Sequence, residues 1–265
     1  MRMLAAPCFV ISDAHLGAAD LDAERKLVAF LRHLPGRAGS LLINGDLFDF
    51  WFEWKTVIPR GHFRTLAALA DLVDAGVPVT MLAGNHDCWG GDVLNREVGI
   101  DYRVSGWAGE LGGWPAVVEH GDGLREEEDR PYRRLRTVLR HPWAIRAFRL
   151  VHPDLGSKLA SGSSDASRVH RARDGGSGLR AVAMDFLGKN PRVRLLVYGH
   201  SHVPALERAP NGALYANPGA WLDAPTYLHV TPDRVELRRW EGGGLAEGHA
   251  LDAIDRIPQE ALPDA

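Results

Sequence analysis

Five short motifs bring aspartate, histidine and asparagine side chains to the close spacing that metal binding requires. They read Asp13-x-His15, Gly45-Asp46-x-x-Asp49, Gly84-Asn85-His86-Asp87, His120-Gly121-Asp122 and Gly199-His200-Ser201-His202. Each motif alone is a weak signal, because short polar motifs arise by chance and a lone histidine at a strand end is more often structural. All five in one chain, each directly after a predicted strand, indicate a centre for divalent cations.

The types of donor atom restrict the chemistry of this centre. Carboxylate oxygens combined with imidazole nitrogens suit Mn²⁺, iron or Zn²⁺. Two neighbouring cations repel each other and need a bridging anion, for which Asp46 is the natural choice, while Asn85 offers a neutral oxygen. Between such cations a water molecule ionises near neutral pH and can attack phosphorus in line. The motifs therefore predict hydrolysis of a phosphoester.

Apolar runs before the motifs predict the strands that would position them. We expect strands over residues 7–12, 40–44, 78–82, 116–119 and 194–198. Helical spacing of apolar residues predicts helices over residues 21–34 and 62–75. An antiparallel finish is expected over residues 214–216, 226–230 and 234–240, with a turn at Pro232-Asp233. This alternation favours an α/β fold with much parallel pairing.

Residues 124–190 differ in composition and in sequence pattern from the rest of the chain. They are rich in arginine, helical in pattern and broken by glycine- and serine-rich stretches. We interpret them as a helical insertion, or cap, between two core strands of a domain that spans residues 1–241. Residues 242–265 are rich in glycine, alanine and acidic side chains, and we expect a frayed C-terminal tail there.

Composition places limits on location and partners. The chain has 265 residues and a formal net charge of −3, so any binding to polyanions such as nucleic acid has to rely on a local basic patch. Its two cysteines, Cys8 and Cys88, are expected to be free thiols in a reducing cytosol. No stretch approaches the length of a membrane-spanning helix. We therefore expect a cytoplasmic protein that meets a membrane, if at all, from the cytosolic face.

With every ligand position filled, the chain resembles the calcineurin-like metallophosphoesterase superfamily. The resemblance implies a β-sandwich flanked by helices. It implies two metal ions, one held by Asp13, His15, Asp46 and His202, the other by Asp46, Asn85, His120 and His200. His86 would stabilise the transition state or protonate the leaving group, and Asp87 would orient His86.

Three further segments resemble the UDP-2,3-diacylglucosamine diphosphatases of lipid A biosynthesis. They are the FDFWFE-like run after Asp46, the HGDGL run that leads to Tyr132, and the HPDLG run at residues 152–156 followed by Ser167-Arg168. The resemblance reaches roughly to Trp240. It implies cleavage of the pyrophosphate to UMP and 2,3-diacylglucosamine 1-phosphate, with two divalent ions, Mn²⁺ above all. It also implies substrate contacts from Asn85, His86, Asp129, Tyr132 and Arg168. Better-known members carry arginine at the place of His86.

The arginines of the insertion alternate with apolar residues between residues 130 and 150. A basic amphipathic helix pair suits an anionic glycolipid or the surface of the inner membrane. A solvated cap is an equally good interpretation, and binding of nucleic acid is a weaker one. Trp51, Phe52 and Trp54 could wall a lipid or sugar pocket, although such clusters more often serve packing. Alternative functions are a general phosphodiesterase or nuclease and, less favoured, a non-catalytic scaffold. The oligomeric state stays open.

Overall fold

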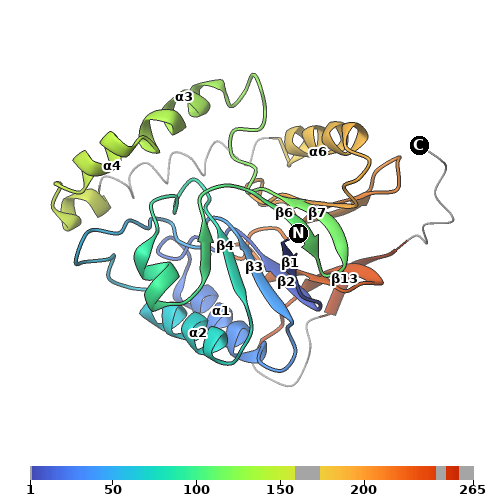
Figure 1. Ribbon diagram of the computed structural model, residues 1–265, viewed down its shortest axis with the longest axis horizontal. Helices are drawn as coiled ribbons and strands as arrows, with labels where there is room; N and C mark the ends of the chain where they lie inside the picture. The colour runs from blue at the N-terminus through green and yellow to red at the C-terminus, as the bar shows by residue number, and fades with distance from the viewer. Residues whose placement is uncertain (1, 159–173, 243–248, 257–265) are drawn as a thin grey trace.

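The computed structural model describes residues 2–158, 174–242 and 249–256, and these form two packed β-sheets flanked by helices (Figure 1). The first sheet has the order β1-β6-β7-β8-β10-β9. Its strands are β1 (Met3–Leu4), β6 (Trp107–Leu111), β7 (Trp114–Val118), β8 (Leu195–Val197), β10 (Leu214–Asn217) and β9 (Ala205–Arg208). The expected α/β sandwich is confirmed.

The second sheet has the order β13-β12-β11-β2-β3-β4-β5. Its strands are β13 (His249–Asp255), β12 (Arg234–Arg239), β11 (Thr226–Val230), β2 (Cys8–Ile11), β3 (Ser40–Asn44), β4 (Val79–Leu82) and β5 (Asp101–Arg103). Strands β2 to β5 run parallel to one another. Their carboxyl ends therefore meet at one edge, where parallel sheets hold their functional loops.

Strand β2 shows how the sheets and helices share the core. Successive side chains of a strand point to opposite faces. Cys8 and Val10 lie between the two sheets, whereas Phe9 and Ile11 lie on the other face of the second sheet. Helices α1 (Leu21–His33) and α2 (Phe63–Asp74) cover that face. The apolar run that predicted this strand is continuous because both of its faces are buried.

Helix α1 begins and ends where local chemistry favours it. The side chain of Asp20 caps it by accepting a hydrogen bond from the backbone N–H of Ala23 at 2.7 Å. Leu27, Phe30 and Leu31 recur at helical spacing and are buried on the sheet. Both predicted helices agree with the structure to within one residue at each end.

The part of residues 124–190 that lies outside the core is shorter than the sequence suggested. Helix α6 (Ser177–Lys189), which we had placed in the cap, packs Leu179, Ala183 and Leu187 on the first sheet. Parallel strands β7 and β8 are neighbours, so the chain must cross over the sheet between them, and α6 makes the return. Helices α3 (Arg130–Leu139) and α4 (Pro142–Phe148) contain no fully buried residue, and we use the word cap for these two helices from here on.

The expected frayed tail is also corrected in part. Residues 249–255 form strand β13, which pairs antiparallel with β12 along its whole length. Its side chains are mostly exposed, so the sequence offered no apolar pattern to reveal it. The short strands β1, β5, β6 and β9 and the π-helix η1 (Val93–Glu97) were likewise not predicted. No helix among the described residues is long and apolar enough to span a bilayer.

Candidate metal centre

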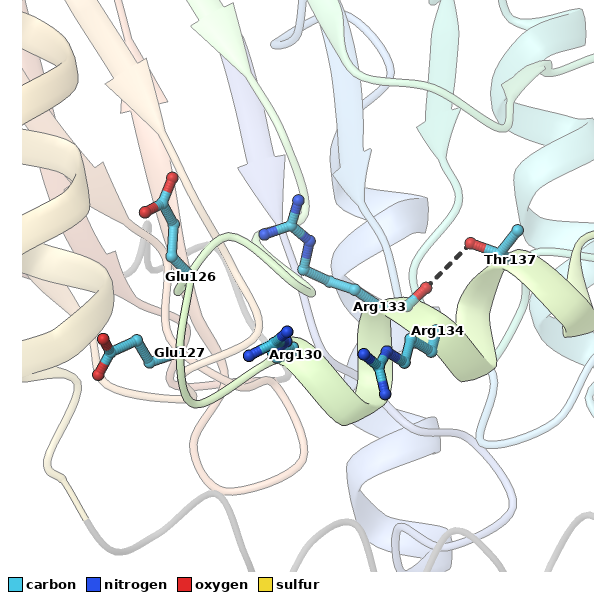
Figure 2. A pocket seen from close by; sticks show the side chains of 6 residues that line it. All are labelled: Glu126, Glu127, Arg130, Arg133, Arg134 and Thr137. Atoms are coloured by element: carbon cyan, nitrogen blue, oxygen red, sulfur yellow. Dashed lines mark hydrogen bonds between the residues drawn. The ribbon is translucent and has the colours of Figure 1, made fainter.

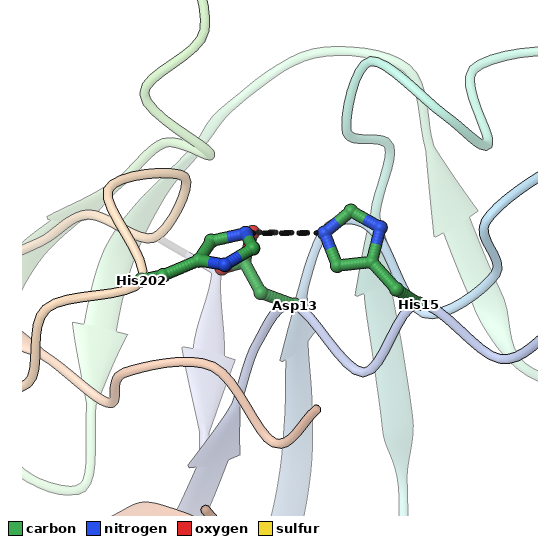
Figure 3. Close-up of side chains that lie close together, drawn as sticks. All are labelled: Asp13, His15 and His202. Carbon is green, nitrogen blue, oxygen red and sulfur yellow. Dashed lines mark hydrogen bonds and ion pairs between the residues drawn. The ribbon is translucent and has the colours of Figure 1, made fainter. Parts of the chain in front are cut away.

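The five motifs converge where strands from both sheets end. Asp13 and His15 follow β2, and Asp46 follows β3. Figure 3 shows Asp13 and His15 facing His202, which comes from the loop after β8. The Nε2 atoms of His15 and His202 lie 3.2 Å apart, and His202 Nε2 lies 3.3 Å from Asp13 Oδ1. These three residues offer one ligand atom each within a space that a single cation would fill.

A second group lies beside the first and consists of Asp46, His120 and His200. Asp46 Oδ2 lies 3.2 Å from His120 Nε2 and 3.7 Å from His15 Nε2. This carboxylate therefore lies between the two groups, which is the position that a bridging ligand needs. All seven residues named as metal ligands from the sequence follow strands that end at this centre.

The backbone at the centre adopts a conformation that side-chain-bearing residues seldom accept. Asp13, His15, Asp46, His200 and His202 all have φ between 43° and 62°. Among the described residues only one further non-glycine residue, His62, has a positive φ. Such strain persists where the surrounding structure imposes it, and it gathers at functional sites. The loops are thus shaped to aim these five side chains.

Two glycines make room for the ligands. A Cβ on Gly84 would lie 2.1 Å from Asp46 Oδ1, and a Cβ on Gly199 would lie 2.2 Å from Ser12 Oγ and 2.9 Å from Asp13 Oδ2. Neither contact is possible for a real side chain. The backbone of both loops can approach the ligands this closely only because these two residues lack a Cβ.

Several buried polar atoms at the centre are left for a cation. Asp13 Oδ1, Asn85 Oδ1 and His120 Nε2 are buried and make no hydrogen bond. His120 Nδ1 donates to the carbonyl of Asn44 at 2.8 Å, which leaves the lone pair of Nε2 directed at the centre. Buried polar atoms rarely go unpaired. Carboxylate, amide and imidazole donors together fit divalent ions such as Mn²⁺, iron or Zn²⁺.

The electrostatics also favour positive charge at this place. Burial lowers the pKa of His15, but its contacts with Asp13 and Asp49 outweigh burial and raise the pKa to about 9. Burial likewise opposes protonation of His120, yet the charges of Asp46 and Asp13 raise its pKa to about 10. Protons are thus held strongly in a metal-free centre, and bound cations would replace them.

His86 is fixed by its backbone surroundings. Its Nδ1 donates to the carbonyl of Asp49 at 2.9 Å, and its ring lies edge-on against His15 with centroids 4.8 Å apart. Nε2 lies 4.0 Å from Asp46 Oδ2. The nitrogen available for chemistry is therefore Nε2, at the rim of the metal centre.

The Asp87 carboxylate is held by backbone groups of two neighbouring loops. The Asp87 carboxylate accepts hydrogen bonds from the backbone N–H groups of Gly84 and Leu47, both at 2.8 Å, with longer ones from Asp46 and Phe48. Burial and the charge of Asp46 raise the pKa of Asp87 to about 7. Asp87 thus ties the loop after β3 to the loop after β4, and the Asp49 carbonyl orients His86.

Some of the residues proposed to contact substrate lie at the metal centre, and others are paired with protein side chains away from it. Asn85 and His86 lie at the centre, whereas Asp129 is paired with Arg125, Oδ1 to Nη2, at 2.8 Å. The hydroxyl of Tyr132 donates to Asp122 Oδ2 at 2.7 Å. Arg168 lies outside the described residues.

Sequence reasoning gave no role to three residues that support the ligands. Asp49 lies 3.6 Å from His15 Nδ1, and Asp223 lies 3.6 Å from His202 Nδ1. Asn217 donates to the carbonyl of Gly199 at 2.9 Å and so holds the loop that carries His200 and His202. The position of Asp49 in its motif was a usable signal for it. Asn217 and Asp223 offered no signal beyond following a strand.

Two of the protein's cavities have charged linings. One of about 730 Å³ lies along α3 and is lined by Glu126, Glu127, Arg130, Arg133, Arg134 and Thr137, as Figure 2 shows. The other, of about 520 Å³, includes Leu16, Asp49 and Arg60 in its lining. Asp49 lies beside both His15 and His86, so this second cavity adjoins the metal centre.

The aromatic cluster after Asp46 serves packing. Trp51, Phe52 and Trp54 are all buried, and Phe52 lies against Phe148 of α4 with ring centroids 4.8 Å apart. Trp54 Nε1 donates to the carbonyl of Val151 at 3.2 Å. These residues therefore hold α4 against the core, which agrees with the packing interpretation.

Comparison with known proteins adds the context of a family. The family model described as calcineurin-like phosphoesterase matches residues 6–204. A protein of Porphyromonas gingivalis named UDP-2,3-diacylglucosamine hydrolase is 32% identical over 74% of this chain and 82% of its own length. Proteins with the same name from Salmonella arizonae and Pseudomonas fluorescens are 30% and 29% identical, over 86% and 97% of this chain and 96% and 99% of their own lengths.

Proposed function

The chain belongs to the calcineurin-like phosphoesterase family, and we propose that it hydrolyses the pyrophosphate of UDP-2,3-diacylglucosamine in lipid A biosynthesis. The products would be UMP and 2,3-diacylglucosamine 1-phosphate. The observation that carries the proposal is the convergence of six histidine and aspartate ligands at one centre, in a chain that matches relatives of that name along most of its length. Asn85 adds a buried oxygen without a hydrogen bond.

We propose that the seven residues hold two divalent cations as the family resemblance implies. Asp13, His15 and His202 would form one side and Asn85, His120 and His200 the other, with Asp46 shared. Bound there, the cations would supply Lewis-acid stabilisation of charge on the phosphoryl group and would increase the acidity of water. Mn²⁺ is our choice among the ions that this donor set fits.

The protein's own groups would position the substrate and manage its charge. A water oxygen forms a bond to the α-phosphorus, and the bond from that phosphorus to the bridging oxygen breaks. UMP carries the oxygen of water, and the sugar phosphate leaves with the bridging oxygen. In its protonated form His86 can donate from Nε2 to a phosphoryl oxygen or to the leaving group, because Nδ1 is already bound to Asp49.

The substrate would extend from the centre into the cavity that Asp49 lines and onward to the cavity along α3. Arg130, Arg133 and Arg134 line the cavity along α3 and would attract the anionic diphosphate. We keep Asp129, Tyr132 and Arg168 as proposed substrate contacts, in addition to Asn85 and His86. The side chains of Asp129 and Tyr132 now bind Arg125 and Asp122. To contact substrate, each side chain would rotate away from that partner or bind the partner and the substrate together.

The reaction can be tested directly on the purified full-length chain. Incubation with Mn²⁺ and UDP-2,3-diacylglucosamine in water enriched in oxygen-18 should release UMP that carries the label. Label in the sugar phosphate would place the attack on the other phosphorus. The substrate assignment fails if no UMP appears while bis(p-nitrophenyl) phosphate is cut, since that result favours a general phosphodiesterase.

The bridging role of Asp46 can be tested separately. Asp46→Ala should lower turnover by on the order of 10³-fold or more, because it removes a ligand from both cations at once. The stability of the variant, measured by thermal unfolding, identifies any loss that comes from misfolding. Full activity of a folded Asp46→Ala protein would exclude the bridging role.

We also propose that residues 1–241 act as one catalytic domain and that the cap meets the cytosolic face of the inner membrane. The cap exposes large apolar side chains, including Leu135 (52% exposed), Val138 (60%) and Trp143 (71%). Arginines lie on the same two helices. Exposed apolar groups beside basic ones are typical of helices that lie in a membrane interface.

A further inference from the structure

Asp122 joins the cap to the loop that carries His120. Its side chain is only 5% exposed, and its Oδ2 accepts a hydrogen bond from Tyr132 Oη at 2.7 Å. Arg140 Nη2 lies 3.4 Å from the same oxygen, and Arg136 Nη1 donates to the Asp122 carbonyl at 2.9 Å. Two side chains of α3, from Tyr132 and Arg136, and that of the following Arg140 thus converge on Asp122, which lies two residues beyond a proposed ligand.

Arg140 also reaches the loop that carries Asn85. Its Nη2 donates to the carbonyl of Gly84 at 3.1 Å, directly before Asn85. A second link runs from Trp89 Nε1 to the carbonyl of Leu139 at 3.0 Å. The end of α3 therefore holds both the loop after β4 and the loop after β7.

These polar contacts matter because α3 has little else to hold it. None of its residues from Arg130 to Leu139 is fully buried. A helix without a buried apolar face is positioned by the hydrogen bonds and ion pairs that it makes. Loss of the contacts at Asp122 should therefore loosen the helix and both loops together.

The ligands on the other side of the centre are held by different parts of the chain. Trp221 donates its backbone N–H to the carbonyl of Ser12 at 3.1 Å, next to Asp13. Asn217 holds the loop that carries His202 and also His200. Both supports lie outside the cap, so the group of Asp13, His15 and His202 does not depend on α3.

We propose that Asp122 and Arg140 are positioning residues that set the cation affinity of the Asn85, His120 and His200 side of the centre, and not of the Asp13, His15 and His202 side. Docking of the cap would thereby control one of the two cation sites. The inference rests on the proposed metal centre but not on the identity of the phosphorylated substrate.

The test is a titration of the metal-stripped full-length protein with Mn²⁺, in which calorimetry and electron paramagnetic resonance measure the binding. We expect two bound ions in the unchanged protein. In Arg140→Met and Asp122→Ala, one ion should bind about 10-fold to 100-fold more weakly, the range for residues that support metal ligands. The other ion should bind as before. Arg140→Lys, which can keep the contact with Gly84, should recover part of the loss.

A double-substitution design identifies the affected side. With His202→Ala, which disables the first side, Arg140→Met should still weaken the remaining ion. With His120→Ala, which disables the second, Arg140→Met should change little. Arg149→Ala removes an exposed arginine directly after α4, and it should leave both affinities unchanged.

The dependence of turnover on Mn²⁺ concentration distinguishes weakened cation binding from a purely structural defect. Raised Mn²⁺ should restore the rate of Arg140→Met toward that of the unchanged protein. Equal weakening of both ions, unchanged binding in both variants, or an unchanged protein that binds no ion would each overturn the inference. A protein that binds two ions as described but does not release UMP would refute only the proposed substrate.

Discussion

At the scale of single residues, one ring nitrogen of His86 is hydrogen-bonded to the protein backbone and the other faces the metal centre. Nδ1 is bound to the carbonyl of Asp49, and the backbone N–H of His86 donates to Asp46 Oδ1 at 2.9 Å. The side chain is only 6% exposed, so it cannot turn away without disturbing the loop. These contacts orient the ring before any substrate binds.

We predict that His86→Ala lowers kcat by about 10²-fold to 10⁴-fold, as expected for loss of a general acid. Cation affinity should stay within about 3-fold of the original, since His86 is not one of the seven proposed ligands. Steady-state kinetics and Mn²⁺ titration measure the two effects. His249→Gln, an exposed histidine of β13, is the matched control. Full turnover of His86→Ala would show that Nε2 has no part in the reaction.

The convergence of the motifs could be predicted from the sequence, but the backbone conformations of their residues could not. Motif spacing and strand ends pointed to Asp13, His15 and Asp46 correctly as neighbours in space. The positive φ of these residues is imposed by contacts between loops that are distant in the chain. For the same reason the sequence did not reveal the hydrogen bond from Leu47 to Asp87, which joins the loop after β3 to the loop after β4.

At the scale of elements, the loops after the strands are packed too closely to accept a side chain at their glycines. We predict that Gly84→Ala costs about 1–3 kcal/mol of unfolding free energy and lowers cation affinity, because its Cβ would collide with Asp46 Oδ1. Gly188→Ala in α6 is the matched control. Its Cβ meets nothing within 4 Å, so it should stabilise the protein by about 0.5–1 kcal/mol. Urea unfolding with and without Mn²⁺ compares the two, and equal effects would refute this account.

The cap offers a second prediction at this scale. Trp143 of α4 and Leu150, two residues beyond α4, are 71% and 90% exposed, and we expect them to insert into the membrane interface. Replacement of both by alanine should weaken binding to phosphatidylglycerol vesicles by about 10-fold or more, given the apolar surface lost. Sedimentation with vesicles measures this.

The control for the cap variant is Leu21→Ala with Phe63→Ala. These side chains are 71% and 68% exposed on α1 and α2, which lie away from the cap in Figure 1. If both double variants lose vesicle binding equally, the cap has no special part in it.

Elements were predictable where burial left a pattern in the sequence. Strands β2, β3 and β4 are buried apolar runs, and α1 and α2 carry one apolar face each. Strand β13 has no such pattern, because it is held by backbone pairing with β12. Helix α6 was assigned to the cap because it follows the arginine-rich stretch, and only its packing on the first sheet shows otherwise.

At the scale of the whole molecule, the centre exists only when both sheets are assembled. Asp13, Asp46 and Asn85 follow strands of the second sheet, whereas His120 follows one of the first. Asn44 joins the sheets, since its Nδ2 donates to the carbonyl of Glu119 at 3.0 Å and its own carbonyl accepts from His120. Local sequence patterns cannot reveal such a junction, because every contact in it is long-range.

Assembly of this junction should make the stability of the metal-free protein depend on pH. The folded pKa values of His15 and His120, about 9 and about 10, lie above the 6.5 of an ordinary histidine. Their stabilisation is therefore complete below about pH 6.5 and is lost as pH rises through the folded pKa values. The pKa values of Asp13 and Asp46 lie well below 3.8, so their contribution is present above that pH and is lost only in acid.

Bound cations would take the place of the protons on the histidines and keep the carboxylates neutralised at high pH. We therefore predict that saturating Mn²⁺ raises Tm more at about pH 8.5 than at about pH 6, by roughly 3 °C or more, and that binding releases protons at the lower pH. Thermal unfolding under nitrogen, with and without the metal, measures the first effect, and calorimetry in buffers of different ionisation enthalpy measures the second. A metal-dependent rise in Tm that is equal or smaller at the higher pH would contradict replacement of protons by cations. The same scans on His120→Ala should show a weaker dependence on pH, because one of the two raised histidines is then missing.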